Sequence, residues 1–221
     1  MIRLLVWRHG RTVWNAQARV QGMSDIDLDE AGEAQAHATA PLLASYTPDL
    51  LVSSDLKRAV QTAAALAQLS GLAVEIDPRL RERDYGVWQG LTVAEIEQRY
   101  PAEYARWRAG QPLTDPGFET ADEVGKRATA ALRDVAERAE GATAVAVTHG
   151  HAARAGIVGL LNWPASAVST LGVLENCHFA ELRHSEPRGW QLRAYNLPGA
   201  LWWVDRSGDG DSGQIPYTPA H

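Results

Sequence analysis

The stretch IRLLVWRHGRT, residues 2–12 of the 221-residue chain, joins a nearly continuous apolar run to a His-Gly step. A short apolar run of this kind predicts a strand buried on both faces, as in a parallel sheet. The segment AVAVTHG, residues 144–150, repeats the arrangement with His149 and Gly150. Because ligands of open parallel α/β sheets bind beyond the carboxyl ends of the strands, His9 and His149 are candidates for one shared site.

Apolar runs alternate with helical patterns along the rest of the chain. Further strands are expected at residues 50–52 and 73–76, and two late strands near residues 177–182 and 190–195. Helices are expected over residues 30–43, 56–67 and 152–161, with two more that open at residues 92 and 120. This alternation predicts an α/β fold with a mostly parallel central sheet, flanked by helices on both faces and carrying an inserted helical cap segment.

Local signals refine the expected helix ends. Pro41 is expected to kink or shorten the helix over residues 30–43. Asp55 is expected to cap the helix that follows it. The segments TVAE (residues 92–95) and TADE (residues 120–123) have the spacing of capping boxes.

The simplest partition is one domain over residues 1–204, with the insert at about residues 92–120. A loop is expected at residues 111–117, where Pro, Asp and Gly gather. Residues 205–221 are rich in Gly, Pro, Asp and Ser and are expected to form a poorly ordered tail.

Composition excludes several classes of protein. Hydrophobic residues make up 45% and charged residues 22%, which is wrong for a disordered chain. The net charge of −6 argues against nucleic acid or an anionic membrane as a partner. The single cysteine, Cys177, excludes an internal disulfide. Neither a signal peptide nor a run of about 18 apolar residues is visible, so a cytoplasmic location is expected.

Four residues at or close to the expected strand ends are suited to binding and transferring a phosphate group. A neutral imidazole such as His9 or His149 is a nucleophile near neutral pH. The planar guanidinium groups of Arg8 and Arg58 suit phosphate oxygens. Two plainer interpretations stay open, namely hydrogen-bonded structural histidines at the strand ends and a solvent-exposed Arg58 on its helix.

Several ordered motifs carry a resemblance to a known family. The segment RHGRTVWN (residues 8–15) resembles the first signature of the histidine phosphatase superfamily, which includes cofactor-dependent phosphoglycerate mutase. Residues 21–36, 53–62, 80–90 and 148–150 resemble its later motifs in the same order. The resemblance spans about residues 2–185 and implies the fold of phosphoglycerate mutase.

The resemblance implies a role for each matching residue. The phosphorylated nucleophile would be His9, and the proton donor would be Glu82, which otherwise reads as a surface carboxylate in RERD, residues 81–84. The remaining site positions, which would hold the phosphoryl group, are Arg8, Arg58, His149, Asn15 and Gln21. No cofactor and no metal ion is expected.

Hydrolysis is favoured over mutase activity, because the segment between Glu82 and His149 looks shorter than the capping material of the mutases. The expected function is a phosphomonoesterase for small sugar or glycerate phosphates, resembling the family branch of glucosyl-3-phosphoglycerate phosphatase and broad-specificity acid phosphatases. The alternatives are a cofactor-dependent phosphoglycerate mutase, an inactive regulatory relative, and a metal hydrolase that uses His149 and His151. The expected partner is a small phosphorylated metabolite, and a homodimer is a further candidate assembly.

Overall fold

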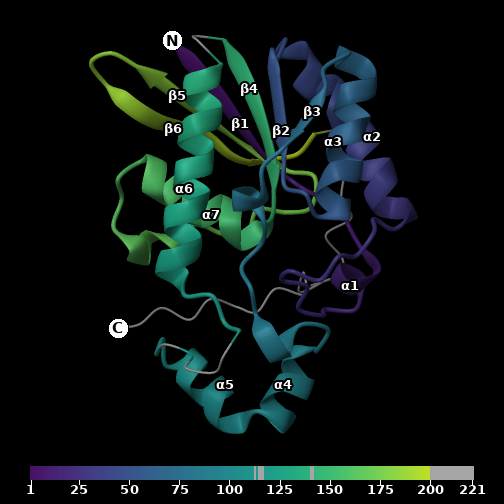
Figure 1. Ribbon diagram of the computed structural model, residues 1–221, viewed down its shortest axis with the longest axis vertical. Helices are drawn as coiled ribbons and strands as arrows, with labels where there is room; N and C mark the ends of the chain where they lie inside the picture. The colour runs from purple at the N-terminus through teal and green to yellow at the C-terminus, as the bar shows by residue number, and fades with distance from the viewer. Residues whose placement is uncertain (112, 114–116, 140–141, 200–221) are drawn as a thin grey trace.

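The computed structural model describes residues 1–111, 113, 117–139 and 142–199, and a six-stranded sheet forms its centre (Figure 1). The strands are β1 (Ile2–Arg8), β2 (Leu50–Ser53), β3 (Val74–Ile76), β4 (Thr143–Thr148), β5 (Phe179–Ser185) and β6 (Gly189–Leu197). Their order across the sheet is β3-β2-β4-β1-β5-β6. The first four are parallel, whereas β5 and β6 are antiparallel to their neighbours. The predicted α/β fold with a mostly parallel sheet is therefore confirmed.

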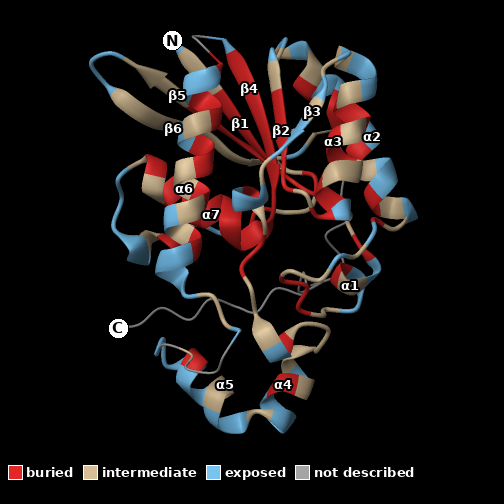
Figure 2. Cartoon of the chain, viewed as in Figure 1, coloured by how far each residue is buried: buried red, intermediate tan, exposed pale blue. Residues whose placement is uncertain are grey.

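Helices cover both faces of the sheet, α2 and α3 on one and α6 and α7 on the other (Figure 1). Their bounds are α2 (Glu30–Ser45), α3 (Lys57–Ser70), α6 (Ala121–Arg138) and α7 (Gly150–Leu160). Strand β1 serves both layers, because Leu4 and Val6 pack against α6 and α7 while Leu5 and Trp7 pack against α2 and α3. This double burial explains the continuous apolar run, and Figure 2 shows the central strands buried beneath helices with exposed outer faces.

A group of short elements lies beyond the carboxyl ends of the strands, at the bottom of Figure 1. Helices α4 (Val93–Arg99) and α5 (Pro101–Arg108) pack around Trp88, which meets Trp107 and Phe118 edge-on at ring distances of 6.0 and 5.0 Å. Both predicted capping boxes are present, at the starts of α4 and α6. The other short elements are α1 (Val13–Ala16), η1 (Pro78–Leu80), η2 (Gly86–Trp88) and η3 (Ala165–Ser169).

Three predicted helix details are wrong. Asp55 does not cap α3, because Leu56 holds the cap position and the Asp55 carboxylate pairs with Arg81 instead. Pro41 does not shorten α2, which runs on to Ser45 because Leu43 beyond the proline is fully buried against the sheet. Helix α7 begins at Gly150 rather than at residue 152.

The predicted tail at residues 205–221 lies outside the described residues, as does most of the predicted loop over residues 111–117. Within the described ranges, no helix is both long and apolar enough to cross a membrane.

Candidate active site

The His9 side chain lies where β1 ends and is held in one tautomer. Its Nδ1 lies 2.7 Å from the carbonyl oxygen of Gly10. A carbonyl oxygen can only accept, so Nδ1 carries the hydrogen and Nε2 keeps its lone pair. The turn is tight at this point, since a Cβ on Gly10 would lie 2.5 Å from the carbonyl oxygen of Gly32. Burial, followed by the nearby charges of Arg58 and Arg8, holds the pKa of His9 well below its ordinary value.

His149, at the end of β4, lies behind His9 with the two ring centroids 5.1 Å apart. Its Nδ1 accepts a hydrogen bond from Arg58 Nε at 3.2 Å, so its Nε2 carries the hydrogen and faces Ser54 Oγ at 2.9 Å. Burial, and then the charge of Arg58, lowers the pKa of His149 well below its usual range. The ring therefore contacts His9 and Arg58, and it is not among the side chains that line the pocket in front of them.

Arg58 is fully buried, so the alternative interpretation of a solvent-exposed helical arginine is wrong. Besides His149, its guanidinium donates to the carbonyl oxygens of Ser24 at 2.6 Å and Gly22 at 2.8 Å. Burial lowers the pKa of Arg58 to about 10, which still leaves it charged at neutral pH. Arg8 is equally buried and donates to the carbonyl oxygen of Leu174 at 2.6 Å. Two fixed cations thus flank His9.

Asn15 and Gln21 are oriented by a residue that the sequence analysis did not select, Thr12. Its backbone N–H donates to Asn15 Oδ1 at 3.1 Å, and its hydroxyl donates to Gln21 Oε1 at 3.0 Å. Because both amide oxygens point to Thr12, both amide NH₂ groups are left to act as donors. Thr12 also caps α1, which fixes the turn after β1.

Glu82 follows η1 and is almost fully buried, so its reading as a surface carboxylate is wrong. Its Oε1 accepts from the backbone N–H groups of Arg83 at 2.8 Å and Ala152 at 3.0 Å, and its Oε2 accepts from the N–H of His151 at 3.0 Å. The last two donors belong to the first turn of α7, where helix N–H groups lack partners within the helix. One acceptor position on Oε2 stays open, which is where a proton can be carried.

These residues surround a polar cavity of about 40 Å³. The predicted residues that line it are Arg8, His9, Asn15, Gln21, Arg58 and Glu82. His151, which the sequence offered as a ligand of an alternative metal hydrolase, also lines it, as do Arg19, Tyr85 and Arg154, which are not among the predicted site residues. Burial raises the pKa of Tyr85 to about 12, so its hydroxyl stays protonated.

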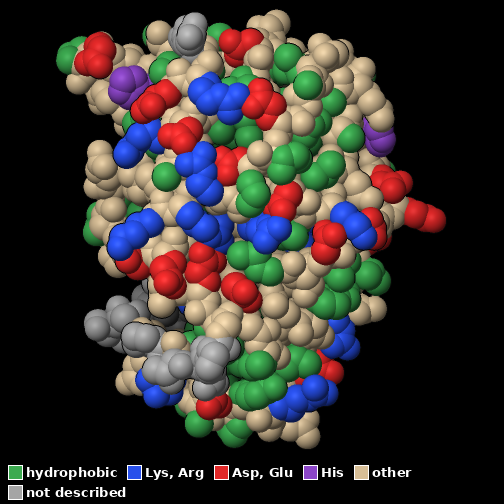
Figure 3. All heavy atoms as spheres, viewed as in Figure 1, with side chains coloured by type: hydrophobic (Ala, Val, Ile, Leu, Met, Phe, Trp, Pro, Cys, Tyr) green, Lys and Arg blue, Asp and Glu red, His purple; other side chains and the backbone are tan. Residues whose placement is uncertain are grey.

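The cavity is rich in positive charge although the chain is acidic. On the face shown in Figure 3, basic and acidic side chains are interspersed. In the cavity, by contrast, four guanidinium groups and two neutral imidazoles face a single carboxylate. A fixed neutral imidazole among cations, with a carboxylate opposite, is the arrangement expected of an α/β protein of the phosphoryl-transfer class.

Comparison with known proteins agrees with this class. Residues 4–198 match the histidine phosphatase superfamily (branch 1). Glucosyl-3-phosphoglycerate phosphatase of Mycolicibacterium vanbaalenii is 36% identical over 214 residues, 92% of each chain. The probable phosphoglycerate mutase of Yersinia enterocolitica is 36% identical over 204 residues, 88% of this chain and 92% of its own. The solved structure of a mycobacterial glucosyl-3-phosphoglycerate phosphatase with inorganic phosphate has a TM-score of 0.79 and 34% identity, covering 90% of this chain and 99% of that one.

The chain therefore belongs to the histidine phosphatase superfamily and is a hydrolase of that family. Among the side chains that the structure describes, no three His, Cys, Asp or Glu residues gather as metal ligands, and this includes the neighbourhood of His149 and His151.

The stability of the fold is expected to depend on pH through three buried imidazoles, His9, His149 and His151. Burial is the largest cause that lowers the pKa of each ring in the folded state. The unfolded chain takes up protons on these rings below about pH 6.5 while the folded protein does not. The free energy of unfolding should therefore fall as the pH drops below 6.5, with a slope approaching about 4 kcal/mol per pH unit for three rings.

Denaturant unfolding in phosphate-free buffer at about pH 7.5, 6.5 and 5.5 measures this slope. The His151→Asn variant should lose about a third of it, since one of the three rings is removed. Equal stability at all three pH values would contradict the assignment of neutral buried rings.

Proposed function

We propose that this protein is a phosphomonoesterase that hydrolyses small phosphate esters through a phosphohistidine on His9, with Glu82 as the proton donor. The observation that carries the proposal is the His9 ring. It is neutral, fixed by its hydrogen bond to Gly10, and flanked by the cations Arg8 and Arg58. A nucleophile needs this combination in order to attack a dianionic phosphate group.

The first step transfers the phosphoryl group to the protein. The lone pair of His9 Nε2 forms a bond to phosphorus while the ester P–O bond breaks and its electron pair stays on the leaving oxygen. Glu82 gives its proton to that oxygen, so the leaving group departs as an alcohol. Arg8 and Arg58 stabilise the charge on the equatorial oxygens, and the amide groups of Asn15 and Gln21 are placed to donate to them.

The second step restores the protein. Glu82, now a carboxylate, takes a proton from a water molecule whose oxygen attacks phosphorus. The P–N bond breaks, its electron pair returns to His9 Nε2, and inorganic phosphate is released. The backbone N–H groups that hold Glu82 keep it in place for both proton transfers.

Arg154 favours a phosphorylated glycerate, which carries a carboxylate besides its phosphate, over a sugar phosphate that has no second anionic group. The side chain is 6% exposed and lines the cavity, and its Nε donates to the Gly150 carbonyl oxygen at 3.3 Å. Its two terminal nitrogens have no hydrogen-bond partner among the described residues. A guanidinium in this state matches a second anionic group such as a carboxylate. The mycobacterial relative, whose name gives a phosphorylated glycerate as its substrate, is consistent with this choice.

A panel assay of phosphate release in chelator-treated buffer tests the function. Release from phosphorylated glycerates and p-nitrophenyl phosphate without added metal is expected, and turnover of the latter would dispose of an inactive relative. The similarity to a phosphoglycerate mutase makes isomerisation the competing activity. Isomerisation of 3-phosphoglycerate faster than its hydrolysis would favour the mutase, and full dependence on a divalent ion would refute the proposed mechanism.

Arg154→Gln is expected to raise the KM for 3-phosphoglycerate by about 10- to 100-fold, because a charge-assisted hydrogen bond contributes about 1.5–3 kcal/mol. The KM for glycerol 3-phosphate, which lacks the carboxylate, should change little. Arg133→Gln, at an exposed position of α6, is the matched control. An equal rise in KM for both substrates would show that Arg154 does not recognise the second anionic group.

A further inference from the structure

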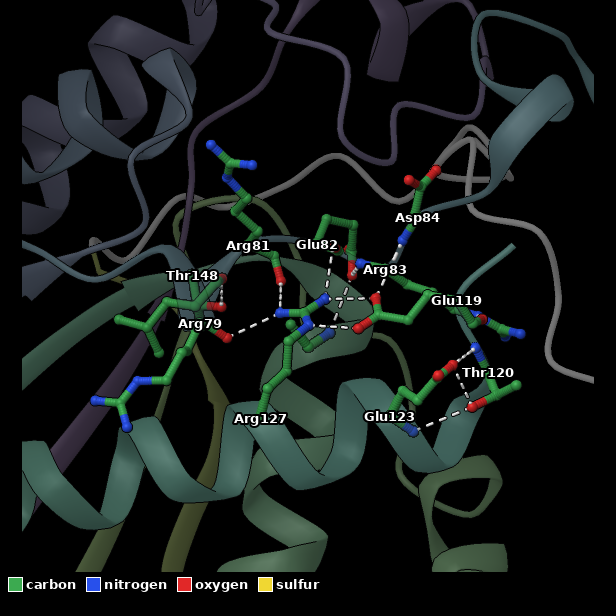
Figure 4. A network of polar contacts seen from close by, with 12 residues as sticks. Arg79, Arg81, Glu82, Arg83, Asp84, Glu119, Thr120, Glu123, Arg127 and Thr148 are labelled. Atoms are coloured by element: carbon green, nitrogen blue, oxygen red, sulfur yellow. Dashed lines mark hydrogen bonds and ion pairs between the residues drawn. The ribbon is translucent and has the colours of Figure 1, made fainter. Parts of the chain in front are cut away.

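The segment that carries Glu82 has no regular secondary structure to hold it, because it runs between η1 and η2. A proton donor must nevertheless keep hydrogen-bond reach to the leaving oxygen, and a misplacement of about 1 Å can cost on the order of 10²-fold in rate. The structure shows what fixes this segment in a cluster of polar contacts drawn in Figure 4.

Arg127, on α6, lies at the centre of that cluster and points towards the segment (Figure 4). Its Nη1 donates to the carbonyl oxygens of Arg79 at 2.8 Å and Arg81 at 2.6 Å, and its Nη2 donates to that of Glu82 at 2.9 Å. Its Nε and Nη2 donate to the two carboxylate oxygens of Glu119 at 2.5 and 2.6 Å. The five N–H donors of the guanidinium are therefore matched by five hydrogen bonds.

Glu119 secures the far side of the same segment. One of its carboxylate oxygens accepts from the N–H of Asp84 at 3.2 Å, and its own N–H donates to the Asp84 carbonyl oxygen at 3.0 Å. Its carbonyl oxygen accepts from Arg83 Nε at 2.7 Å. Arg127 and Glu119 are only 19% and 14% exposed, so water screens their ion pair weakly. The backbone on both sides of Glu82 is thus fastened to this pair.

We propose that Arg127 and Glu119 are positioning residues for the reaction, which set the place of the Glu82 carboxylate. This inference rests on the proposed function, since it requires Glu82 to be the proton donor. Neither residue lines the cavity, so neither is placed to touch the substrate. Lysine has three donors and no fork, and it cannot replace the five hydrogen bonds of Arg127.

The test uses two substrates that differ in their need for a proton donor. Alkyl phosphates such as glycerol 3-phosphate need a proton on the departing oxygen, whereas the weakly basic nitrophenolate departs without one. Arg127→Met should lower kcat/KM for glycerol 3-phosphate by about 10- to 100-fold and leave that for p-nitrophenyl phosphate little changed. Glu119→Gln, a milder change that keeps the side-chain size, should act in the same direction to a smaller extent.

Arg79→Met is the matched control. Arg79 also ties the segment to α6, through an exposed ion pair with Asp134 at 2.7 Å, but it makes no side-chain contact with Glu82. Both kcat/KM values should therefore be retained in this variant. A selective loss for the alkyl substrate in Arg79→Met equal to that in Arg127→Met would overturn the special role of Arg127 and Glu119.

A double-mutant cycle with Glu82→Gln decides whether Arg127 acts through Glu82. In the Glu82→Gln background, Arg127→Met should cause no further loss with glycerol 3-phosphate, and a loss that adds in full would overturn the inference. If Arg127→Met does not fold, Glu119→Gln takes its place in the cycle. If Glu82→Gln keeps its kcat/KM for glycerol 3-phosphate, Glu82 is not the proton donor, and the inference fails with it. If Glu82→Gln loses kcat/KM for that substrate but neither Arg127→Met nor Glu119→Gln does, the inference alone is refuted.

Discussion

His9→Ala is expected to lower the rate of phosphate release by on the order of 10⁴-fold or more, since it removes the ring on which the proposed covalent intermediate forms. The second imidazole cannot take over. His149 lies behind His9, its Nδ1 is occupied by Arg58, and its Nε2 faces Ser54. Acid-labile, base-stable phosphate on the protein, detected after rapid quenching with a radiolabelled substrate, should disappear with the activity.

Two measurements separate lost chemistry from lost structure in His9→Ala. Inorganic phosphate should still bind, because Arg8 and Arg58 keep their own backbone partners. The control His37→Ala, at an exposed position of α2, should retain full activity and labelling. If His9→Ala keeps more than a small residual rate of phosphate release and still becomes labelled, the nucleophile is a residue other than His9.

Glu82→Gln is expected to lower the turnover of alkyl phosphates by about 10²- to 10⁴-fold, which is the usual contribution of a general acid–base group. With p-nitrophenyl phosphate, Glu82→Gln should slow the hydrolysis of the phosphohistidine but not its formation. The first step needs no proton, so it should proceed, whereas the second lacks the base that activates water. Rapid-mixing measurements should therefore show a burst of about one equivalent of nitrophenolate, with phosphohistidine accumulating.

Glutamine also places an NH₂ group where a carboxylate oxygen accepts from the backbone. One of the three N–H donors around Glu82 would then face another donor, which costs about 1–3 kcal/mol of stability. The burst amplitude should accordingly be measured per folded molecule. Glu97→Gln, at an exposed position of α4, should show neither a burst nor a rate change. If Glu82→Gln slows both steps with p-nitrophenyl phosphate equally, this would contradict the proposal that the Glu82 carboxyl acts as an acid in the first step and as a base in the second.

The fold follows from the sequence because its strands are buried on both faces. Strand β1 presents alternate residues to the two helical layers, so its four consecutive positions from Leu4 to Trp7 are all apolar and the pattern is clear. Helix ends are less readable, because tertiary contacts compete with local preference. Asp55 has the chemistry of a cap, yet its carboxylate pairs with Arg81, which is distant in sequence. Helix α2 continues past Pro41, because burial of the residues around the proline outweighs its tendency to end a helix.

The site was predictable where residues follow strand ends or lie in the motifs, and hidden where a helix buries a charged side chain. Arg154, on α7, has the appearance of an ordinary helical arginine and becomes a cavity residue only through tertiary burial. Thr12 stood within the first motif, but its role depends on two amide oxygens that only the folded turn brings to it. His149 stays a predicted phosphoryl-binding residue, and what the sequence could not show is that its ring packs against Arg58 and His9.

The short helices α4 and α5 supply none of the described hydrogen bonds of His9, Arg58 or Glu82, whose partners come from other parts of the chain. They meet the site at its rim, for example where Arg19 pairs with Glu95 of α4 at 2.8 Å. The contacts that fix these three side chains are thus independent of α4 and α5. The equivalent segment of a relative could therefore replace α4 and α5, in laboratory grafting or natural divergence, without removing any of these hydrogen bonds.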